Sequence, residues 1–442
     1  MGGNTLLLFV RTVIVTLCGA VAVRLAIAAL GVDGYGTYAT AMGVVGLFML
    51  FKGALEQTAR RFVSHEFGLG ASGDVQAAFS SVLLVSLALV AFLLVLGETV
   101  GLWFVRHVLS VPPDGARAIV VAYQFGLLVS SAALLTVPFA ALISADERMA
   151  FFVVAGAVGS TAALVAAGVA SVCPRFGRET YAATLAAGEI ASLALHVVFC
   201  RVRFPHVRVS ARCPVARLRG TAAFLGWGAL SSVGNALKYR GTSILVNRSF
   251  GVAFNASWDV ALKVWDYIHS FCADFMQAFS PPIFKSWAAK KRGRMASLAA
   301  WTTLVSALIA AFPAAIVFAF APAIVGVWLG DGAPPQVVAF VRCSALNVVF
   351  DAASNPLTTA ILATGRVKLY QTVACAFSLA GFASAGALLA AGQPAWTAMA
   401  AVAASNGGAL AYRYLHVRLL MGLRPSFAVL RASSPESAQS DS

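Results

Sequence analysis

The polar residues of segment 252–279 follow a helical spacing within an otherwise apolar stretch. Successive polar residues are separated by four, three, four, four and three positions, so they lie on one narrow helical face. They are Asp259, Lys263, Asp266, Ser270, Asp274 and Gln277. Ionisable side chains of a hydrophobic helix face water or protein, because exposure to hydrocarbon is costly. The pattern therefore predicts a polar cavity or interior lined by this helix.

Two interpretations of this face remain open. Lys263 can pair internally with Asp259 and Asp266, which lie about one turn away on either side. Alternatively, these charges contact ligands. Even with internal pairing one carboxylate is left over, and Asp274 is a candidate to carry a proton or bind a cation.

Three further apolar segments carry polar residues. Segment 221–246 has one stripe, Ser231, Asn235, Lys238 and Thr242, with Arg240 pointing the other way on an ideal helix. Segment 337–363 has a second stripe, Asn347, Asp351, Ser354 and Thr358. Near the N-terminus, Arg24 either faces a cavity or extends to the membrane interface. Basic groups in a cavity favour an anionic substrate such as a phosphate or pyrophosphate, and the carboxylates suit coupling to an ion gradient.

The composition places these segments in a membrane. Hydrophobic residues make up 60% of the 442 residues and charged residues only 11%, against about 25% charged in soluble proteins. A helix needs about 20 apolar residues to cross the hydrocarbon core. This criterion predicts twelve spans, at 5–29, 38–57, 78–103, 118–143, 150–172, 181–200, 221–246, 252–279, 297–320, 337–363, 369–391 and 394–417.

A basic bridge, residues 201–220, separates the first six spans from the second six. It contains six arginines, and most of the 32 lysines and arginines fall on the same side of the predicted topology. Because such residues accumulate in cytoplasmic loops, we expect the bridge and both termini to be cytoplasmic. The bridge could otherwise be a nucleic-acid-binding arm, but such an arm needs a soluble domain around it, so no nucleic-acid partner is expected.

The two halves of the chain share landmarks. Tyr38 matches Trp258, and Gln57 matches Gln277, each pair 220 positions apart. Because six spans is an even number, the halves have the same orientation and are related by an axis along the membrane normal. We therefore predict an all-α polytopic membrane protein with a V-shaped pair of six-helix bundles. Its parts are an N-terminal lobe at 1–200, the cytoplasmic linker at 201–220, a C-terminal lobe at 221–420 and a tail at 421–442.

Motifs of enzymes and cofactor sites are missing from the sequence. It contains no GxxxxGK[ST] phosphate-binding loop. It also has no His and Cys cluster with metal-ligand spacing, and no large outer loop for glycosyl transfer. We expect neither enzymatic activity nor a cofactor or metal.

Residues 10–68 resemble the opening of the polysaccharide (oligosaccharide) flippase family, within the multidrug/oligosaccharidyl-lipid/polysaccharide exporter superfamily. The features that carry the resemblance are Arg24, the turn at 30–36 and Arg60-Arg61-Phe62. In the second half, Phe250-Gly251 with Asn255 and the segment 281–285 resemble the family's repeat of that region.

The resemblance implies a transporter of the bacterial inner membrane, of the O-antigen or exopolysaccharide type, that moves undecaprenyl-(pyro)phosphate-linked oligosaccharide between leaflets. On this model the substrate contacts Arg24, Asn235, Lys238, Arg240 and Lys263, and ion coupling involves Asp259, Asp266, Asp274 and Asp351. Polysaccharide polymerases and glycosyltransferases are the expected partners, beside membrane lipids.

Two alternatives remain. A multidrug or toxin cation antiporter shares this fold, and we expect its cavity to be dominated by carboxylates, whereas the charges here are mixed. A membrane-embedded glycan polymerase or ligase is less favoured, because it needs a long outer loop with clustered charges.

Overall fold

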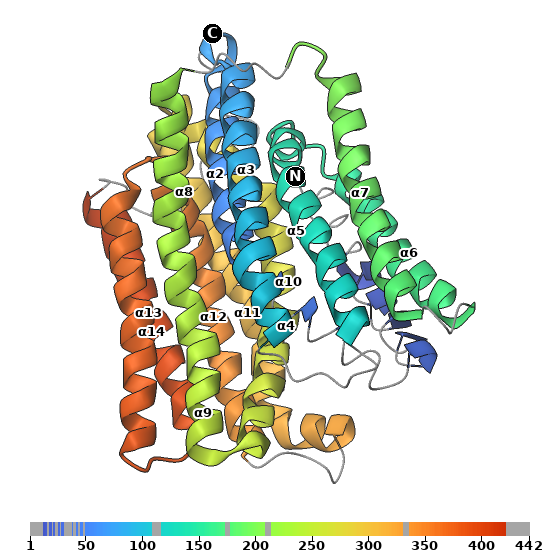
Figure 1. Cartoon of the computed structure of the whole chain (residues 1–442). Coiled ribbons are helices and arrows are strands. Elements are labelled where there is room, and N and C mark those ends of the chain that lie inside the picture. Colours follow the sequence, from blue (N-terminus) through green and yellow to red (C-terminus); the bar gives the residue numbers. More distant parts are fainter. Residues whose placement is uncertain are drawn as a thin grey trace. The chain divides into compact units, whose positions relative to one another are not determined.

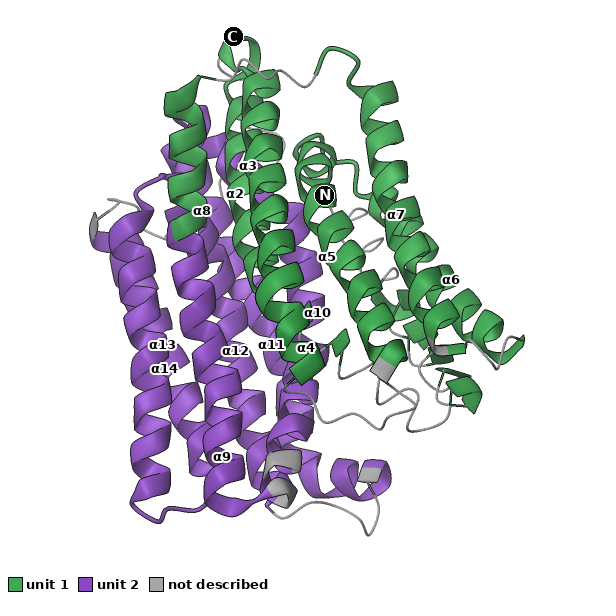
Figure 2. Cartoon of the chain, in the orientation of Figure 1, with its two compact units in different colours: residues 1–226 green, residues 227–442 purple. Residues whose placement is uncertain are grey.

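The computed structural model describes residues 49–107, 116–172, 177–207, 214–329 and 336–420, together with short pieces of 12–46. Within these ranges the regular elements are helices (Figure 1). The chain divides into two compact units, Met1–Gly226 and Trp227–Ser442 (Figure 2). The predicted linker 201–220 lies N-terminal to this division, at the end of the first unit.

From residue 49 on, the described part of the first unit contains six α-helices and the start of a seventh. They are α2 (Leu50–Gly68), α3 (Val75–Leu96), α4 (Leu102–His107), α5 (Ala116–Ala145), α6 (Ala150–Val172), α7 (Gly177–Arg203) and the start of α8 (Val215–Ala236). Helix α5 packs against α2, α3 and α7, and α6 packs against α7. Small residues allow close approach, since a Cβ on Gly188 would lie 2.2 Å from the Cβ of Ala162.

The second unit holds the rest of α8 and the helices that follow it. These are a π-helical turn, η5 (Leu237–Gly241), then α9 (Thr242–Phe250), α10 (Val252–Ala288), α11 (Arg292–Leu329), α12 (Val337–Ala363), α13 (Val367–Ala390), α14 (Thr397–Leu415) and η7 (His416–Leu420). Helix α12 packs against α10, α11 and α14. It is central to the core, where Trp258 and Phe340 are fully buried with ring centroids 6.4 Å apart.

Seven of the described helical segments are long and apolar enough to cross a membrane. They are Val75–His107, Arg117–Ala145, Ala150–Val172, Glu179–Arg203, Arg292–Trp328, Val337–Ala363 and Val367–Ala390. Helices α2, α8, α10 and α14 are not among these seven. Their polar residues explain this, and α10 is the clearest case, since it carries Asp259, Lys263 and Asp266 on one face. The predicted span 5–29 is only partly described, because 5–11 and several later positions lie outside the described residues.

Several helix ends differ from those predicted. Helix α2 continues past the predicted end at 57 as far as Gly68, so that Arg60 and Arg61 lie within it. The bridge is partly helical, because Arg201–Arg203 complete α7 and 215–220 begin α8. Apolar periodicity does not show such extensions, because a helix can continue beyond the hydrocarbon core with polar residues.

A proline in α11 produces a kink that an arginine of α12 compensates. Phe320 has non-helical dihedrals (φ −100°, ψ 16°) two residues before Pro322. Proline has no N–H for the carbonyl four residues earlier, which belongs to Phe318. The Nε of Arg342 donates to this carbonyl at 3.1 Å. Arg342 therefore completes the hydrogen bonding of a broken helix.

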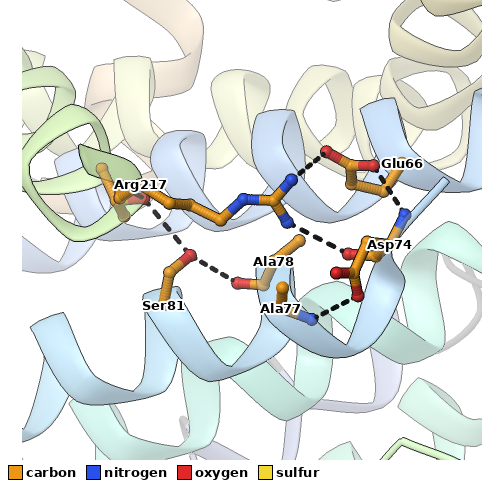
Figure 3. Close-up of polar contacts among 7 residues, drawn as sticks. Glu66, Asp74, Ala77, Ala78, Ser81 and Arg217 are labelled. Atoms are coloured by element: carbon orange, nitrogen blue, oxygen red, sulfur yellow. Dashed lines mark hydrogen bonds and ion pairs between the residues drawn. The ribbon is translucent and has the colours of Figure 1, made fainter. Parts of the chain in front are cut away.

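A polar cluster at the end of the first unit fixes the start of α8. Two nitrogens of Arg217 donate, one to the Glu66 carboxylate and one to the Asp74 carbonyl, each at 3.2 Å (Figure 3). The Asp74 N–H donates to the other Glu66 oxygen at 2.8 Å, and the Asp74 side chain caps α3 by accepting from the Ala77 N–H. The turn between α2 and α3 and the first turn of α8 are thus held by one guanidinium and one carboxylate.

We predict that Arg217→Ala destabilises the first unit. The change removes an ion pair and leaves the Glu66 carboxylate, only 13% exposed, without its charged donor. Hydrogen bonds to charged groups contribute about 1.5–3 kcal/mol. Thermal unfolding in detergent should show a lower midpoint for Arg217→Ala than for Arg219→Ala, an exposed arginine with no ion pair in the described structure. Equal midpoints would contradict a stabilising role for the cluster.

Candidate functional site

The π-helical turn η5 inserts an extra residue between α8 and α9 and carries three polar side chains in sequence. These are Lys238, Tyr239 and Arg240. Single π-turns inside helices are frequent at functional sites, because the additional residue changes the direction of the side chains that follow. Here Lys238 is buried in the second unit, whereas Arg240 is exposed.

Lys238 is the centre of a buried polar group. Its side chain is 3% exposed, and its Nζ donates to Oδ1 of Asn406 at 2.6 Å. The ammonium also lies 4.9 Å from the centroid of the Tyr239 ring, which adds a cation–π contact. Its aliphatic part passes Gly381 of α13, where a Cβ would lie 3.4 Å from the Lys238 Cδ.

Two asparagines and a tyrosine complete this group, which we call the Lys238 cluster (Lys238, Tyr239, Asn347 and Asn406). Asn406 donates through Nδ2 to Oδ1 of Asn347 at 2.7 Å and to the Tyr239 hydroxyl at 3.0 Å. Asn347 donates to the same hydroxyl at 3.2 Å. Asn347 and Asn406 are 0% and 4% exposed. Their amide groups therefore bond to protein in place of water.

Charged residues adjoin the Lys238 cluster on two helices. Asp351 follows Asn347 by one turn on α12, and Arg413 follows Asn406 by two turns on α14. The charges of Asp351 and Arg413 are both within electrostatic range of Lys238. The Nε of Arg413 donates to the Tyr370 hydroxyl of α13 at 3.0 Å. The Tyr370 hydroxyl is also 3.0 Å from the Thr358 hydroxyl. Polar contacts thus connect α12, α13 and α14.

The stripe on α8 is occupied by contacts with α13. Ser231 donates to both the side-chain and the backbone oxygen of Gln371. The Oδ1 of Asn235 accepts a hydrogen bond from the Ser378 hydroxyl at 3.1 Å. The predicted substrate contact at Asn235 stays a prediction, and the structure shows that its carbonyl oxygen already has a partner.

The polar face of α10 is accessible along part of its length. Asp259, Lys263 and Asp266 are exposed, whereas Asp274 is 6% exposed. Among the described residues no ion pair joins Lys263 to Asp259 or Asp266. The structure therefore does not show the internal ion pairing of Lys263 with these two carboxylates.

Arg240 and His269 are within electrostatic range of Asp266. Trp265 stacks on His269 with centroids 4.4 Å apart and lies 5.8 Å from the ring of Tyr239. The face of α10 is thus adjacent to η5. Of the predicted site residues, the structure brings Lys238 near Asp351 and Arg240 near Asp266. Arg24 lies outside the described residues.

Three members of this region were not singled out from the sequence. Asn406 is a lone amide in the apolar segment 394–417, Gln371 lies beside Thr372 at the start of the segment 369–391, and Tyr239 lies between Lys238 and Arg240. A polar residue within a membrane span is by itself a signal of a partner inside the protein. That signal was present for Asn406, but no local spacing identified the partner.

Comparisons with known proteins give a fold but no close relative. No family model matches the chain, and no curated protein matches it. Among solved structures, a MOP superfamily transporter from Pyrococcus furiosus has a TM-score of 0.77 at 11% identity, covering 95% of this chain and 96% of that one. A MATE transporter in the bent conformation gives 0.78 at 12% identity, covering 97% and 98%.

The MATE transporter ClbM in complex with Rb⁺ gives a TM-score of 0.73 at 15% identity, covering 97% of this chain and 96% of that one. The fold is that of a MATE transporter. This confirms the predicted all-α polytopic membrane fold of twelve helices in two bundles. The superfamily to which the sequence resemblance pointed stays a prediction. The narrower resemblance to polysaccharide flippases stays a prediction.

We predict that Gly381→Ala disrupts the surroundings of Lys238. The new Cβ would lie 2.8 Å from the Ser405 Cβ and 3.4 Å from the Lys238 Cδ. Overpacking of this kind costs about 1–3 kcal/mol. In denaturant titrations of detergent-solubilised protein, Gly381→Ala should unfold earlier than wild type.

Gly326→Ala on α11 is the control, since a Cβ there meets nothing within 4 Å. This control should be neutral or slightly stabilising, because alanine is favoured over glycine in helices. Equal stability of the two variants would show that the space beside Lys238 is not tightly packed.

Proposed function

We propose that the chain is a transporter of the inner membrane that moves its substrate by alternating access, and that the substrate is an undecaprenyl-(pyro)phosphate-linked oligosaccharide. The MATE fold supports the transporter part of the proposal. The substrate part depends on the charges of the second unit. We propose no catalytic reaction, and we place both termini in the cytoplasm on the basis of the arginine and lysine distribution.

The observation that carries the substrate assignment is a pair of exposed basic residues within the predicted spans. Arg240 and Lys263 are both exposed, and neither makes an ion pair with a carboxylate in the described part of the chain. A cation at membrane depth is costly against lipid, so such residues face a polar space. Basic groups that make no direct ion pair there favour an anionic group such as pyrophosphate.

A cation antiporter is the second candidate, and the solved neighbours favour it over the flippase. Several of them are described as MATE transporters, one of these a multidrug resistance transporter and one in complex with Rb⁺. Asp259 and Asp266 are exposed on α10 and can contact a cationic substrate. Against this, the Pyrococcus furiosus neighbour is described as having a binding pocket of reverse polarity that suggests a different function. The charge of the pocket therefore distinguishes functions within this fold.

Partners follow from the substrate. A transporter of lipid-linked oligosaccharide takes its substrate from glycosyltransferases on one side of the membrane and supplies a polysaccharide polymerase on the other. We propose these two classes of enzyme as partners, because they build and consume the molecule that the chain would carry.

We predict that Lys263→Gln and Arg240→Gln each slow translocation of a fluorescent undecaprenyl-pyrophosphate-linked oligosaccharide in proteoliposomes. Loss of one charge-assisted contact should reduce the translocation rate about tenfold or more, because about 1.4 kcal/mol corresponds to a tenfold change. Arg248→Gln is the matched control, because Arg248 is exposed at the end of α9, away from η5.

The same vesicles distinguish the two candidates. If wild type moves the lipid-linked sugar and the control variant does as well, the flippase proposal stands. If wild type moves no lipid-linked sugar but expels a cationic dye such as ethidium, and Asp266→Asn stops the expulsion, the cation antiporter replaces it.

A further inference from the structure

The surroundings of the Lys238 ammonium have the chemistry of a small cation site. Oδ1 of Asn406 accepts from its Nζ, and the Tyr239 ring faces it. The Asp351 carboxylate is a negative charge within electrostatic range of the Lys238 ammonium. Oxygen atoms of amides, hydroxyls and a single carboxylate are the ligands that hard cations such as alkali and alkaline-earth ions prefer.

We propose that the Lys238 cluster together with Asp351 is a monovalent-cation site that the chain fills with its own lysine. The proposal concerns the transporter described above and deepens it, but the site itself can be tested without any substrate. Lys238 was assigned to substrate binding from the sequence, and its burial points to this internal role instead.

The energetics argue that the charge at this position has a function. An ammonium buried among helices loses its hydration, and this cost is compensated only by good hydrogen bonds and an opposite charge. An apolar residue of similar size at position 238 would avoid the cost. Instead, the chain places Oδ1 of the buried Asn406 against the charge at 2.6 Å and holds that amide in position through the buried Asn347. Ionisable residues retained inside membrane spans are functional by default.

Each helix packed around Lys238 contributes identified groups. Helix α12 provides Asp351, and α14 provides Arg413, whose positive charge also reaches Lys238. Helix α13 passes with Gly381, which leaves room for the lysine side chain. On α10, Asp266 is within electrostatic range of Tyr239. Lys238 therefore lies between one nearby carboxylate and one nearby guanidinium.

The Lys238 ammonium is covalently attached to the chain, so it cannot dissociate from the site as a bound ion can. Na⁺ can dissociate from a site, but the Lys238 ammonium can lose its charge only by giving up a proton, leaving a neutral amine. The site can therefore respond to a proton gradient and is indifferent to a Na⁺ gradient. Transport by the wild-type protein should accordingly proceed equally well in sodium and in choline buffers.

Replacement of Lys238 by methionine tests the site directly. Methionine reproduces the lysine side chain as far as Cε and leaves the position of Nζ vacant. The measurement is thermal unfolding of purified protein in NaCl against choline chloride at equal ionic strength. Wild type should have the same midpoint in both salts. Lys238→Met should show a saturable rise in midpoint with NaCl, because an ion that binds only the folded state stabilises it.

Three further variants make the test specific. Lys238→Arg keeps the site filled and should show no response to NaCl. Lys238→Met combined with Asp351→Asn should lose the response, because the carboxylate is gone. Lys368→Ala, which removes an exposed lysine of the same unit, should behave as wild type.

A folded Lys238→Met protein that shows no sodium-specific stabilisation would overturn the proposal, and so would an equal response of wild type. If Lys238→Met does not fold in choline chloride, NaCl should recover it, and equal yields in the two salts would likewise overturn the proposal. Because no substrate is present, failure here leaves the flippase and antiporter candidates untouched.

Discussion

A buried ammonium is the constraint on which the interior of the second unit depends. Lys238 is 3% exposed, and its charge is stable there only with partners held in position. Asn406 supplies the direct partner at 2.6 Å, and it is itself fixed by Asn347 and Tyr239. These side chains come from η5, α12 and α14, so the hydrogen bonds also fix the positions of these elements along one another.

Apolar packing and polar contacts serve different purposes in this unit. The core contains large buried side chains such as Trp258 and Phe340, and van der Waals packing of this kind holds membrane helices together. The polar residues select one arrangement among the many that apolar contact allows, because a shifted helix would leave amides without partners. Arg342, which donates to the carbonyl left without its helical donor by Pro322, has the same role in joining α11 to α12.

Polar contacts in the first unit lie at a helix end instead. Arg217 joins the first turn of α8 to the turn between α2 and α3 through Glu66 and the carbonyl of Asp74. These groups are partly exposed, so their net contribution is smaller than that of a fully buried pair would be. From the sequence, Arg217 was one of six arginines that marked the cytoplasmic side. The structure assigns it a specific carboxylate.

Local periodicity explains what the sequence could predict. The stripes containing Asn235 and Lys238, and Asn347 and Asp351, follow helical spacing, so the polar faces can be recognised from the order of residues alone. The contacts that assemble the site are not local. Asn406 lies 168 positions from Lys238, and Glu66 lies 151 positions from Arg217, so no spacing rule connects them. The π-turn at Leu237–Gly241, which carries both Lys238 and Arg240, also has no compositional signal.

The most direct test of this account is a double-mutant cycle between Lys238 and Asn406. Unfolding free energies would be measured in detergent for wild type, Lys238→Met, Asn406→Leu and the double variant. A charge-assisted hydrogen bond at the centre of the unit predicts a coupling energy of about 1.5–3 kcal/mol, with the double variant less destabilised than the sum of the single variants. Additive effects, with a coupling below about 0.5 kcal/mol, would contradict the central position given to the buried lysine.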